Sequence, residues 1–270
     1  MSGFIYNGKS TESILSSPLM LASFDSIDSI KGSERNGENG EITILRPISN
    51  EYGTTYSNTP FEYSLVKQNG EIIDKEEQVI IERWLTSSKF SKNLQIIDLN
   101  GDVVCTYCGK FMSTEWKPCG NGWAGVVFSF ESNFPYPFKE FEYTYEIRGE
   151  ETIDLNCDSD ELEEYIYPIV TITEPNETAQ VNIINITDKS NTMEITAYHG
   201  LSMTFDCLHC IPSDGTTNGI ISYSDLGWTD VGNIYWLRLL PGINKIKIIG
   251  NADVTISFKC PFKRVGGWFL

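Results

Sequence analysis

The chain has 270 residues, 40% of them hydrophobic and 12% aromatic, which is enough for two ordinary domains with apolar cores and excludes an overall disordered chain. With 37 acidic residues against 20 basic ones, the formal net charge is −17. That excess disfavours nucleic acid as a specific partner, because phosphate contacts need Lys or Arg, and it disfavours anionic membranes. No run approaches the ~18 apolar residues of a membrane span, and residues 1–10 lack the features of a signal peptide. We therefore expect a soluble protein that is synthesised in a cytoplasm.

Strand signals dominate the first half of the chain. β-Branched and aromatic runs predict strands over residues 42–46, 61–66, 94–98, 103–107 and 123–130. Asn69-Gly70 follows the second run, and Asn100-Gly101 separates the third from the fourth. Because Asn and Gly tolerate positive φ, each pair predicts the turn of a β-hairpin.

Residues 74–85 break this pattern and predict an amphipathic helix. Asp74 is placed to accept hydrogen bonds from the first free amides, and Glu76 and Glu77 lie at the positive end of the helix dipole. The apolar residues that recur at helical spacing, and that we expect to share one buried face, are Ile80, Ile81, Trp84 and Leu85.

The character of the sequence changes near residue 140. Residues 133–138 contain two prolines and cannot run through a sheet interior. Strands are then predicted over residues 167–173, 180–186, 193–198, 203–207, 236–240, 245–249 and 254–259. In the last of these, Val254, Ile256 and Phe258 face one way and the residues between them the other. We predict a mostly β protein with two domains, residues 1–139 and 140–270, the second a sandwich or jelly roll.

Seven cysteines are scattered along the chain. Two pairs have Cys-x-x-Cys spacing, Cys105 with Cys108 and Cys207 with Cys210, but a zinc ribbon needs its pairs much closer in sequence. The residues that would supplement a pair are Cys119 and His209. Buried, reduced thiols are the alternative that we favour, so we predict no metal and no cofactor.

Motifs for catalysis are scarce. The two histidines, His199 and His209, lie in no known catalytic motif. With 37 acids, some carboxylate pair at glycosidase separation arises by chance. One acidic run lacks the spacing of a calcium loop and is better explained as a solvated loop; it comprises Asp154, Asp158, Asp160, Glu161, Glu163 and Glu164. We predict no catalytic residues and no enzymatic activity.

Two tryptophans of the second domain are candidates for stacking on a sugar ring. Trp236 lies inside a predicted strand and is better explained as a core residue. Trp228 follows Gly227 in a predicted loop, and the sequence leaves both readings of it open.

Several motifs, taken in order, resemble one family. In the first domain they are residues 4–10 as an opening strand and turn, Arg35-Asn36-Gly37 as an early glycine turn, Arg83-Trp84-Leu85 at the end of the helix, a strand that contains Tyr107, and residues 128–136 with Pro135-Tyr136. In the second domain they are residues 165–172 as the first strand, and residues 240–248 with Pro241-Gly242 as a closing hairpin whose strand ends over residues 259–264. Their order and spacing resemble the distal tail proteins (Dit) of long-tailed bacteriophages, over nearly the whole chain. The Cys-x-x-Cys pairs are not features of that family.

The resemblance implies a first domain of β-sandwich, helix and hairpin that forms a six-membered ring, and a galectin-like β-sandwich as the second. It implies a virion protein of the tail tip, a baseplate hub that joins the tail tube protein to the tail-associated tip protein and anchors receptor-binding proteins. An acidic lumen would let DNA slide through. The alternative function is a carbohydrate-binding module or receptor-binding protein that recognises host glycans.

Overall fold

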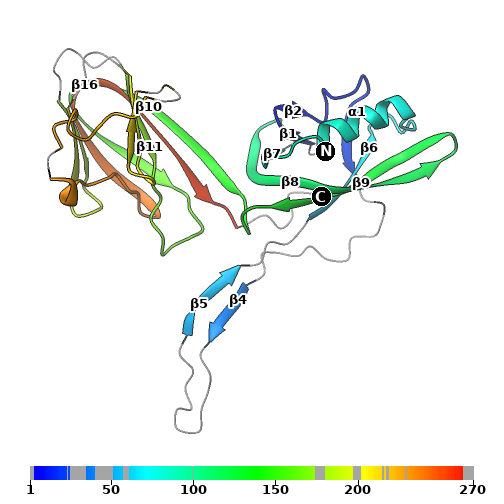
Figure 1. Ribbon diagram of the computed structural model, residues 1–270, viewed down its shortest axis with the longest axis horizontal. Coiled ribbons are helices and arrows are strands. Elements are labelled where there is room, and N and C mark those ends of the chain that lie inside the picture. The colour runs from blue at the N-terminus through cyan, green and yellow to red at the C-terminus, as the bar shows by residue number, and fades with distance from the viewer. Residues whose placement is uncertain are drawn as a thin grey trace, which may run out of the picture. The chain divides into compact units, whose positions relative to one another are not determined.

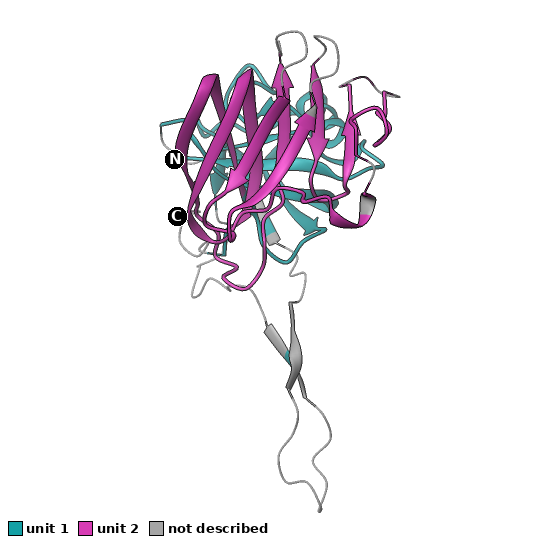
Figure 2. Ribbon diagram, turned by 90° about the vertical axis from the view of Figure 1, so that its left-hand side faces the viewer, with its two compact units in different colours: residues 1–138, 262–270 teal, residues 139–261 magenta. Residues whose placement is uncertain are grey.

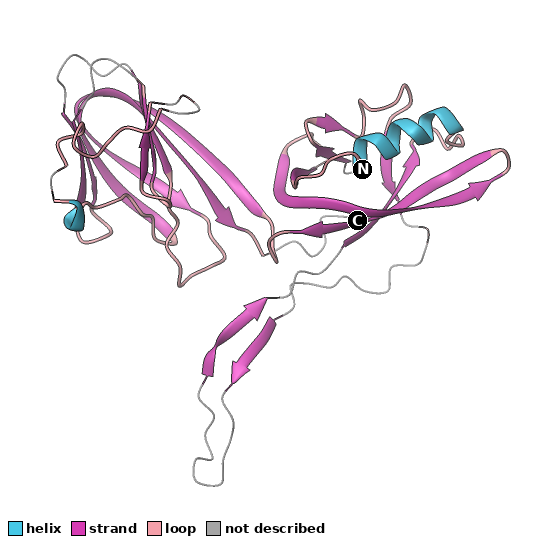
Figure 3. Ribbon diagram, in the orientation of Figure 1, coloured by secondary structure: helices cyan, strands magenta, loops and turns pink. Residues whose placement is uncertain are grey.

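The structure is a computed structural model, and it describes residues 3–22, 24, 35–39, 51–56, 61–98, 100–173, 180–196, 202–214, 216, 219–228 and 230–263. The chain divides into two compact units (Figure 2). Unit 1 comprises Met1–Phe138 and Phe262–Leu270, and unit 2 comprises Lys139–Pro261. Strands predominate in both (Figure 3). The mostly β fold class is therefore confirmed, whereas the galectin-like detail stays a prediction.

Unit 1 is an antiparallel sheet with one helix against it (Figure 1). Its strands follow one another in the sheet in the order β2-β1-β7-β8-β9-β6-β3. Their bounds are β1 Gly3–Tyr6, β2 Lys9–Ser10, β3 Leu19–Ala22, β6 Phe61–Lys67, β7 Lys92–Ile97, β8 Val103–Cys119 and β9 Gly122–Ser132. Two further strands, β4 Arg35–Asn39 and β5 Glu51–Tyr56, pair only with each other among the described residues.

The turns of unit 1 confirm two predictions. Asn7 and Gly8 have φ of 50° and 76° and link β1 to β2, as the opening strand and turn require. Asn100 and Gly101 turn β7 into β8, and the carboxylate of Asp98 accepts hydrogen bonds from the backbone N of Asn100 (2.8 Å) and of Asp102 (2.9 Å). This local side-chain bonding closes the turn.

Two other turn predictions are wrong. Gly70 has φ of 75° and does form a turn, but the chain then enters the helix instead of a partner strand. The physical reason is that both edges of β6 are already paired, with β3 and β9. Arg35-Asn36-Gly37 was predicted as a glycine turn, and the structure places it in β4, where Gly37 pairs with Thr54. The predicted strand over residues 42–46 lies outside the described residues.

Helix α1, Lys75–Thr86, forms where it was predicted. Asp74 Oδ1 accepts from the N of Glu76 (2.8 Å) and of Glu77 (2.9 Å), and Glu77 Oε2 accepts from the N of Asp74 (3.0 Å), which completes a capping box. Ile81, Trp84 and Leu85 are buried as expected. Ile80 is 45% exposed, so its assignment to the buried face is wrong. Successive residues are ~100° apart around a helix, and this one falls on the flank of the apolar stripe.

Unit 2 encloses a second apolar core. Its sheet runs β15-β14-β11-β16-β10, and β12 joins β16 to β13. The bounds are β10 Phe138–Cys157, β11 Ile169–Thr173, β12 Gln180–Asn185, β13 Asn191–Thr196, β14 Met203–Asp206, β15 Ile211–Ser213 and β16 Gly242–Pro261, with a short 3-10 helix η1 over Val231–Asn233. Val254, Ile256 and Phe258 all face the core, which confirms the predicted alternation.

Three strand predictions in unit 2 need correction. The strands predicted over residues 245–249 and 254–259 are parts of one strand, β16, which pairs with β12 over residues 246–249 and with β11 over residues 253–257. Gly250 lies between these stretches. Its φ of 151° and the close approach of the Gln180 carbonyl oxygen, 3.0 Å from where a Cβ would lie, both disfavour any other residue there. Residues 236–240 form no strand, only an isolated bridge between Leu239 and Ile166. In addition, no strand was predicted where β10 lies, because its many acidic residues hide the alternation of buried and exposed side chains.

Candidate functional site

Three indole N–H groups fasten helix α1 to the rest of unit 1. Trp84 Nε1 donates to the carbonyl oxygen of Tyr6 at 2.9 Å, and its side chain is buried. Trp116 Nε1 donates to Glu82 Oε1 at 2.7 Å, and Trp123 Nε1 donates to Gln78 Oε1 at 2.8 Å. The helix is thereby attached to β1 and to both strands of the long β8–β9 hairpin.

The outer part of that hairpin is supported by the same residues. The rings of Trp116 and Trp123 lie 5.8 Å apart, and Gln78 Nε2 also donates to Glu82 Oε1 at 3.3 Å. The backbone of Trp123 exchanges two hydrogen bonds with Ile73, of 2.8 and 2.9 Å. An extended two-stranded ribbon is marginally stable alone, so these contacts position the hairpin as a firm projection of unit 1.

Two neighbouring apolar residues of α1, one opposite the buried face and one on its flank, point toward solvent. Val79 is 51% exposed and Ile80 is 45% exposed. We call these two residues the helix surface. Single exposed apolar residues are ordinary, but two adjacent ones on a helix whose other face is fully packed offer a contact area for a protein partner.

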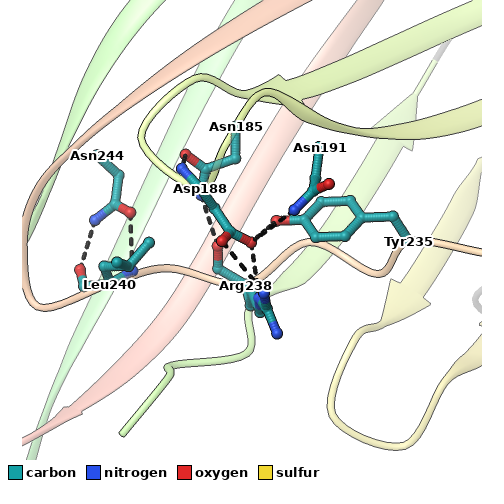
Figure 4. Close-up of polar contacts among 7 residues, drawn as sticks. All are labelled: Asn185, Asp188, Asn191, Tyr235, Arg238, Leu240 and Asn244. Carbon is teal, nitrogen blue, oxygen red and sulfur yellow. Dashed lines mark hydrogen bonds and ion pairs between the residues drawn. The ribbon is translucent and has the colours of Figure 1, made fainter. Parts of the chain in front are cut away.

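In unit 2 the most elaborate polar cluster is centred on Asp188, which is 4% exposed (Figure 4). Arg238 donates to both carboxylate oxygens, Nε to Oδ2 at 2.7 Å and Nη2 to Oδ1 at 3.2 Å. Tyr235 Oη donates to Oδ2 at 2.9 Å, and Asn191 Nδ2 donates to the same oxygen at 3.4 Å. These bonds, that of Arg238 first, hold the pKa of Asp188 below its usual range, while burial and the neighbouring carboxylate raise the pKa of Tyr235.

Two asparagines extend this cluster along the loops of unit 2. Asn185 Oδ1 accepts from the N of Asp188 at 3.1 Å, and its Nδ2 donates to the carbonyl oxygen of Arg238 at 2.7 Å. Asn244 exchanges two hydrogen bonds with the backbone of Leu240, of 2.8 and 2.6 Å. With both carboxylate oxygens of Asp188 engaged, the arrangement suits a structural fastener between loops and not an acid or base held ready for a substrate.

The structure does not bring the Cys-x-x-Cys pairs together as metal ligands. Cys105 is buried and Cys108 half-buried on β8, where an odd separation places them on opposite faces of the strand. Cys207 is buried, which raises the pKa of its thiol to about 12, while Cys210 is exposed with φ of 58°. In the part of the chain that the structure describes, no group of three or more His, Cys, Asp and Glu residues is placed to hold a metal ion.

The remaining polar candidates lie at the surface or cannot be placed. Cys119 is exposed at the end of β8. His209 is exposed, and its Nδ1 lies 2.7 Å from Asp206 Oδ2. His199 lies outside the described residues. The loop prediction is wrong for Asp154, which is exposed but lies in β10. The acids from Asp158 to Glu164 are exposed or half-buried in the segment after that strand, as a solvated loop requires.

The two tryptophans belong to one aromatic cluster of unit 2. Trp228 and Trp236 are half-buried against the core, with ring centroids 5.4 Å apart, and Tyr223 lies 5.6 Å from Trp228. Trp228 Nε1 donates to the carbonyl oxygen of Glu194 at 2.7 Å. The N–H is therefore occupied, and the aromatic neighbours cover part of the ring surface that would stack on a sugar.

Two features of the structure had no signal in the sequence. The Asp188 cluster joins residues far apart in the chain, and no motif marks it. Cys157 and Cys260 are both buried with their Sγ atoms 3.4 Å apart, although they are 103 residues apart in sequence. The alternation of β16 predicts that Cys260 faces inward, but nothing predicts what it meets there.

Within the described residues, no helix has the length and apolar character needed to cross a membrane. No curated protein matches this sequence. Two family models do match it: one described as the phage tail protein N-terminal domain over residues 1–133, and one described as the phage tail C-terminal domain over residues 136–258.

Three solved structures share the fold. The SPP1 Dit protein, described as a paradigm of the hub adsorption apparatus in phages infecting Gram-positive bacteria, is 13% identical with a TM-score of 0.60, over 97% of this chain and 99% of that one. Baseplate chains of phage P2 in its activated conformation are 9% identical, with TM-scores of 0.58 (with Ca) and 0.57 (with Sr), over 98% of this chain and 100% of each of those. The resemblance inferred from the sequence is confirmed: this chain belongs to the family of phage tail proteins defined by these two domains, and it has the fold of the Dit hub.

Proposed function

We propose that this chain is the distal tail hub of a bacteriophage, forming a six-membered ring that connects the tail tube to the tail-associated tip protein and anchors receptor-binding proteins. The observation that supports this proposal most strongly is the match to the structure of SPP1 Dit, which extends over 97% of this chain and 99% of that one. Both domains of a hub are therefore present in one chain. A virion protein of this kind is synthesised in the cytoplasm of the host and acts at the tail tip.

Unit 1 supplies the ring contacts in this proposal. A ring needs a heterologous interface, in which one patch of each subunit meets a different patch of the next. The helix surface and the β8–β9 hairpin are suited to this, because one offers exposed apolar side chains and the other a firmly held projection. Placing two carboxylates in an apolar contact disrupts it, since the charges lose water without gaining partners.

The first test is the mass of the full chain by light scattering, with negative-stain images of any oligomer. We expect a six-fold ring, and we expect the double substitution Val79→Asp with Ile80→Asp to yield monomers. Ile220→Asp is the matched control, because that residue of unit 2 is 73% exposed and the ring should survive its change. A closed ring of another symmetry would contradict the six-membered assembly.

The position in the particle needs a separate test. Gold-labelled antibody against this chain should mark only the tail tip of intact virions. Cross-linking of virions should recover the tail tube protein on one side and the tip protein on the other. Labelling along the whole tail, or on the head, would end the hub proposal even if the purified chain formed rings.

We further propose that the protein acts without catalysis, because the buried carboxylate of Asp188 serves loop structure. Glycan recognition by the second domain is the alternative function. The packing of Trp228 weighs against it, since its ring is half-buried against the core with Tyr223 and Trp236 beside it, which leaves less of the ring face for a sugar. A glycan array of the full chain beside Trp228→Ala would revive it if binding were found and then lost in the variant.

A further inference from the structure

Two buried thiols meet between the first and the last strand of unit 2, at the end of each. Cys157 is the last residue of β10, and Cys260 is the next-to-last residue of β16. Both side chains are 0% exposed, and their Sγ atoms are 3.4 Å apart. β10 and β16 are the first and last strands of the unit, and they are neighbours in its sheet.

The surrounding backbone keeps the two cysteines together. The N of Asp160 donates to the carbonyl oxygen of Pro261 at 3.0 Å, and the N of Ser159 donates to that of Cys157 at 2.8 Å. A disulfide needs an S–S distance of about 2.05 Å, so the sulfurs have to approach by only about 1.4 Å. A sulfur atom moves on this scale when its side chain rotates about the Cα–Cβ bond.

We propose that Cys157 and Cys260 form a disulfide once the protein leaves the reducing cytoplasm, a modification that locks unit 2 in the mature particle. The timing rests on the proposed virion role, whereas the chemistry depends on the pair alone. The link would join strands 103 residues apart in sequence, and a loop of this length loses much of its unfolded-state entropy when it is closed.

The oxidant required is a low-molecular-weight disulfide such as glutathione disulfide. The thiolate of one cysteine attacks a sulfur of that disulfide, and one glutathione leaves as a thiolate that takes up a proton. The second cysteine loses its proton and attacks the mixed disulfide at the protein sulfur, so the Cys157–Cys260 bond forms and a second glutathione leaves. Two protein thiols are oxidised and one small disulfide is reduced to two thiols. The hydrogen bond from Cys260 lowers the pKa of Cys157, which favours it as the attacking thiolate.

Burial makes this reaction depend on opening of the β10 and β16 ends. Neither sulfur is exposed to solvent, so an oxidant reaches the pair only when these ends separate briefly. Oxidation should therefore be slow in the folded protein and faster near the unfolding temperature. The exposed thiols of Cys119 and Cys210 should react first, giving mixed disulfides with glutathione.

The test uses the purified full chain, reduced and then equilibrated with glutathione disulfide at a temperature just below unfolding. Remaining thiols are alkylated in denaturant, and the unreduced protein is digested and mapped by mass spectrometry. We expect a peptide cross-linked through Cys157 and Cys260, and a melting temperature of unit 2 higher by roughly 10 °C than in the reduced protein. Alkylation of both cysteines after that treatment, or pairing of either with another cysteine, would overturn the proposal.

Single variants separate this bond from other oxidation. Cys157→Ala and Cys260→Ala should each abolish the dependence of the melting temperature on redox conditions, whereas the control Cys207→Ala, at another buried thiol, should retain it. If a variant does not fold, the peptide map of the unaltered chain decides alone. The assay scores a covalent bond in a purified chain, so its outcome is independent of whether the chain forms a hub.

Discussion

At the scale of single residues, Asp188 shows how unit 2 holds a buried charge. Its carboxylate has two hydrogen bonds from Arg238 and one each from Tyr235 and Asn191. The Arg238 guanidinium also lies 4.1 Å from the ring centroid of Tyr165, so the partner charge is itself supported. A buried ion pair adds little net stability compared with apolar residues, but removing one partner leaves the other uncompensated.

Asp188→Asn should therefore lower the free energy of unfolding by about 2–4 kcal/mol, because the Arg238 charge loses its counter-ion in a mostly buried site. Urea unfolding of the full chain measures this. The control is Asp253→Asn, whose pair with Arg148 is more exposed and should cost about 1 kcal/mol or less. Equal losses in both variants would show that Asp188 contributes nothing beyond a surface ion pair.

The same carboxylate gives a pH dependence. Because its pKa is lowered in the folded protein, the Asp188 contribution is fully present above the unfolded-state pKa of about 4 and is lost as the pH falls through the lower folded-state value. Melting temperatures from pH 6 to pH 2 should therefore converge for the unaltered chain and Asp188→Asn at the acid end. A constant difference over that whole range would exclude this linkage.

At the scale of elements, helix α1 is held by its cap, its apolar face and three indole donors. The capping box satisfies the first amides locally, whereas Trp84, Trp116 and Trp123 connect the helix to strands distant in sequence. The hydrogen bond of Trp116 is the one with a charged acceptor, the Glu82 carboxylate. Hydrogen bonds to charged groups stabilise more than neutral ones.

Trp116→Phe should lower the free energy of unfolding by about 1–2 kcal/mol, through loss of the N–H bond to the half-buried Glu82. A double-mutant cycle with Glu82→Ala, which removes the acceptor, isolates that bond, and we expect a coupling energy of about 1 kcal/mol from denaturant unfolding. Additive effects of the two substitutions would mean that Trp116 acts only through the area its ring buries.

At the scale of the whole molecule, the chain has two apolar cores. Residues 1–138 supply nearly all of the first core, and residues 139–261 supply the second. The predicted domains, residues 1–139 and 140–270, remain a proposal about units that fold independently. The compact units differ from them at the end of the chain, because Phe262 packs in the core of unit 1 and is 3% exposed. The chain therefore returns to the core of unit 1 at Phe262.

Residues 139–261 alone should fold cooperatively, because nearly all side chains of the second core lie within that segment. Circular dichroism and thermal unfolding check this. Extending the segment to residue 270 should leave its melting temperature unchanged, while Phe262→Ala in the full chain should destabilise unit 1. A segment that melts without a cooperative transition would show that the two units fold only as one.

Local physical chemistry determined a large part of this protein from the sequence. The Asp74 cap with the apolar spacing of Ile81, Trp84 and Leu85 specifies a helix, and Asn100-Gly101 specifies a turn, because each depends on a few consecutive residues. The alternation over residues 254–259 indicates which side chains face a core. The ordered motifs indicated the family, which the two domain models confirm.

Only the tertiary structure decided the features that depend on distant neighbours. Asn69-Gly70 has the same turn chemistry as Asn100-Gly101, but β6 already has a strand on each edge, so no hairpin forms there. β16 is continuous because different stretches of it pair with β12 and with β11. The Asp188 cluster and the Cys157–Cys260 contact join residues roughly 50 and 103 positions apart. Such contacts depend on strand order and register, which no short stretch of sequence encodes.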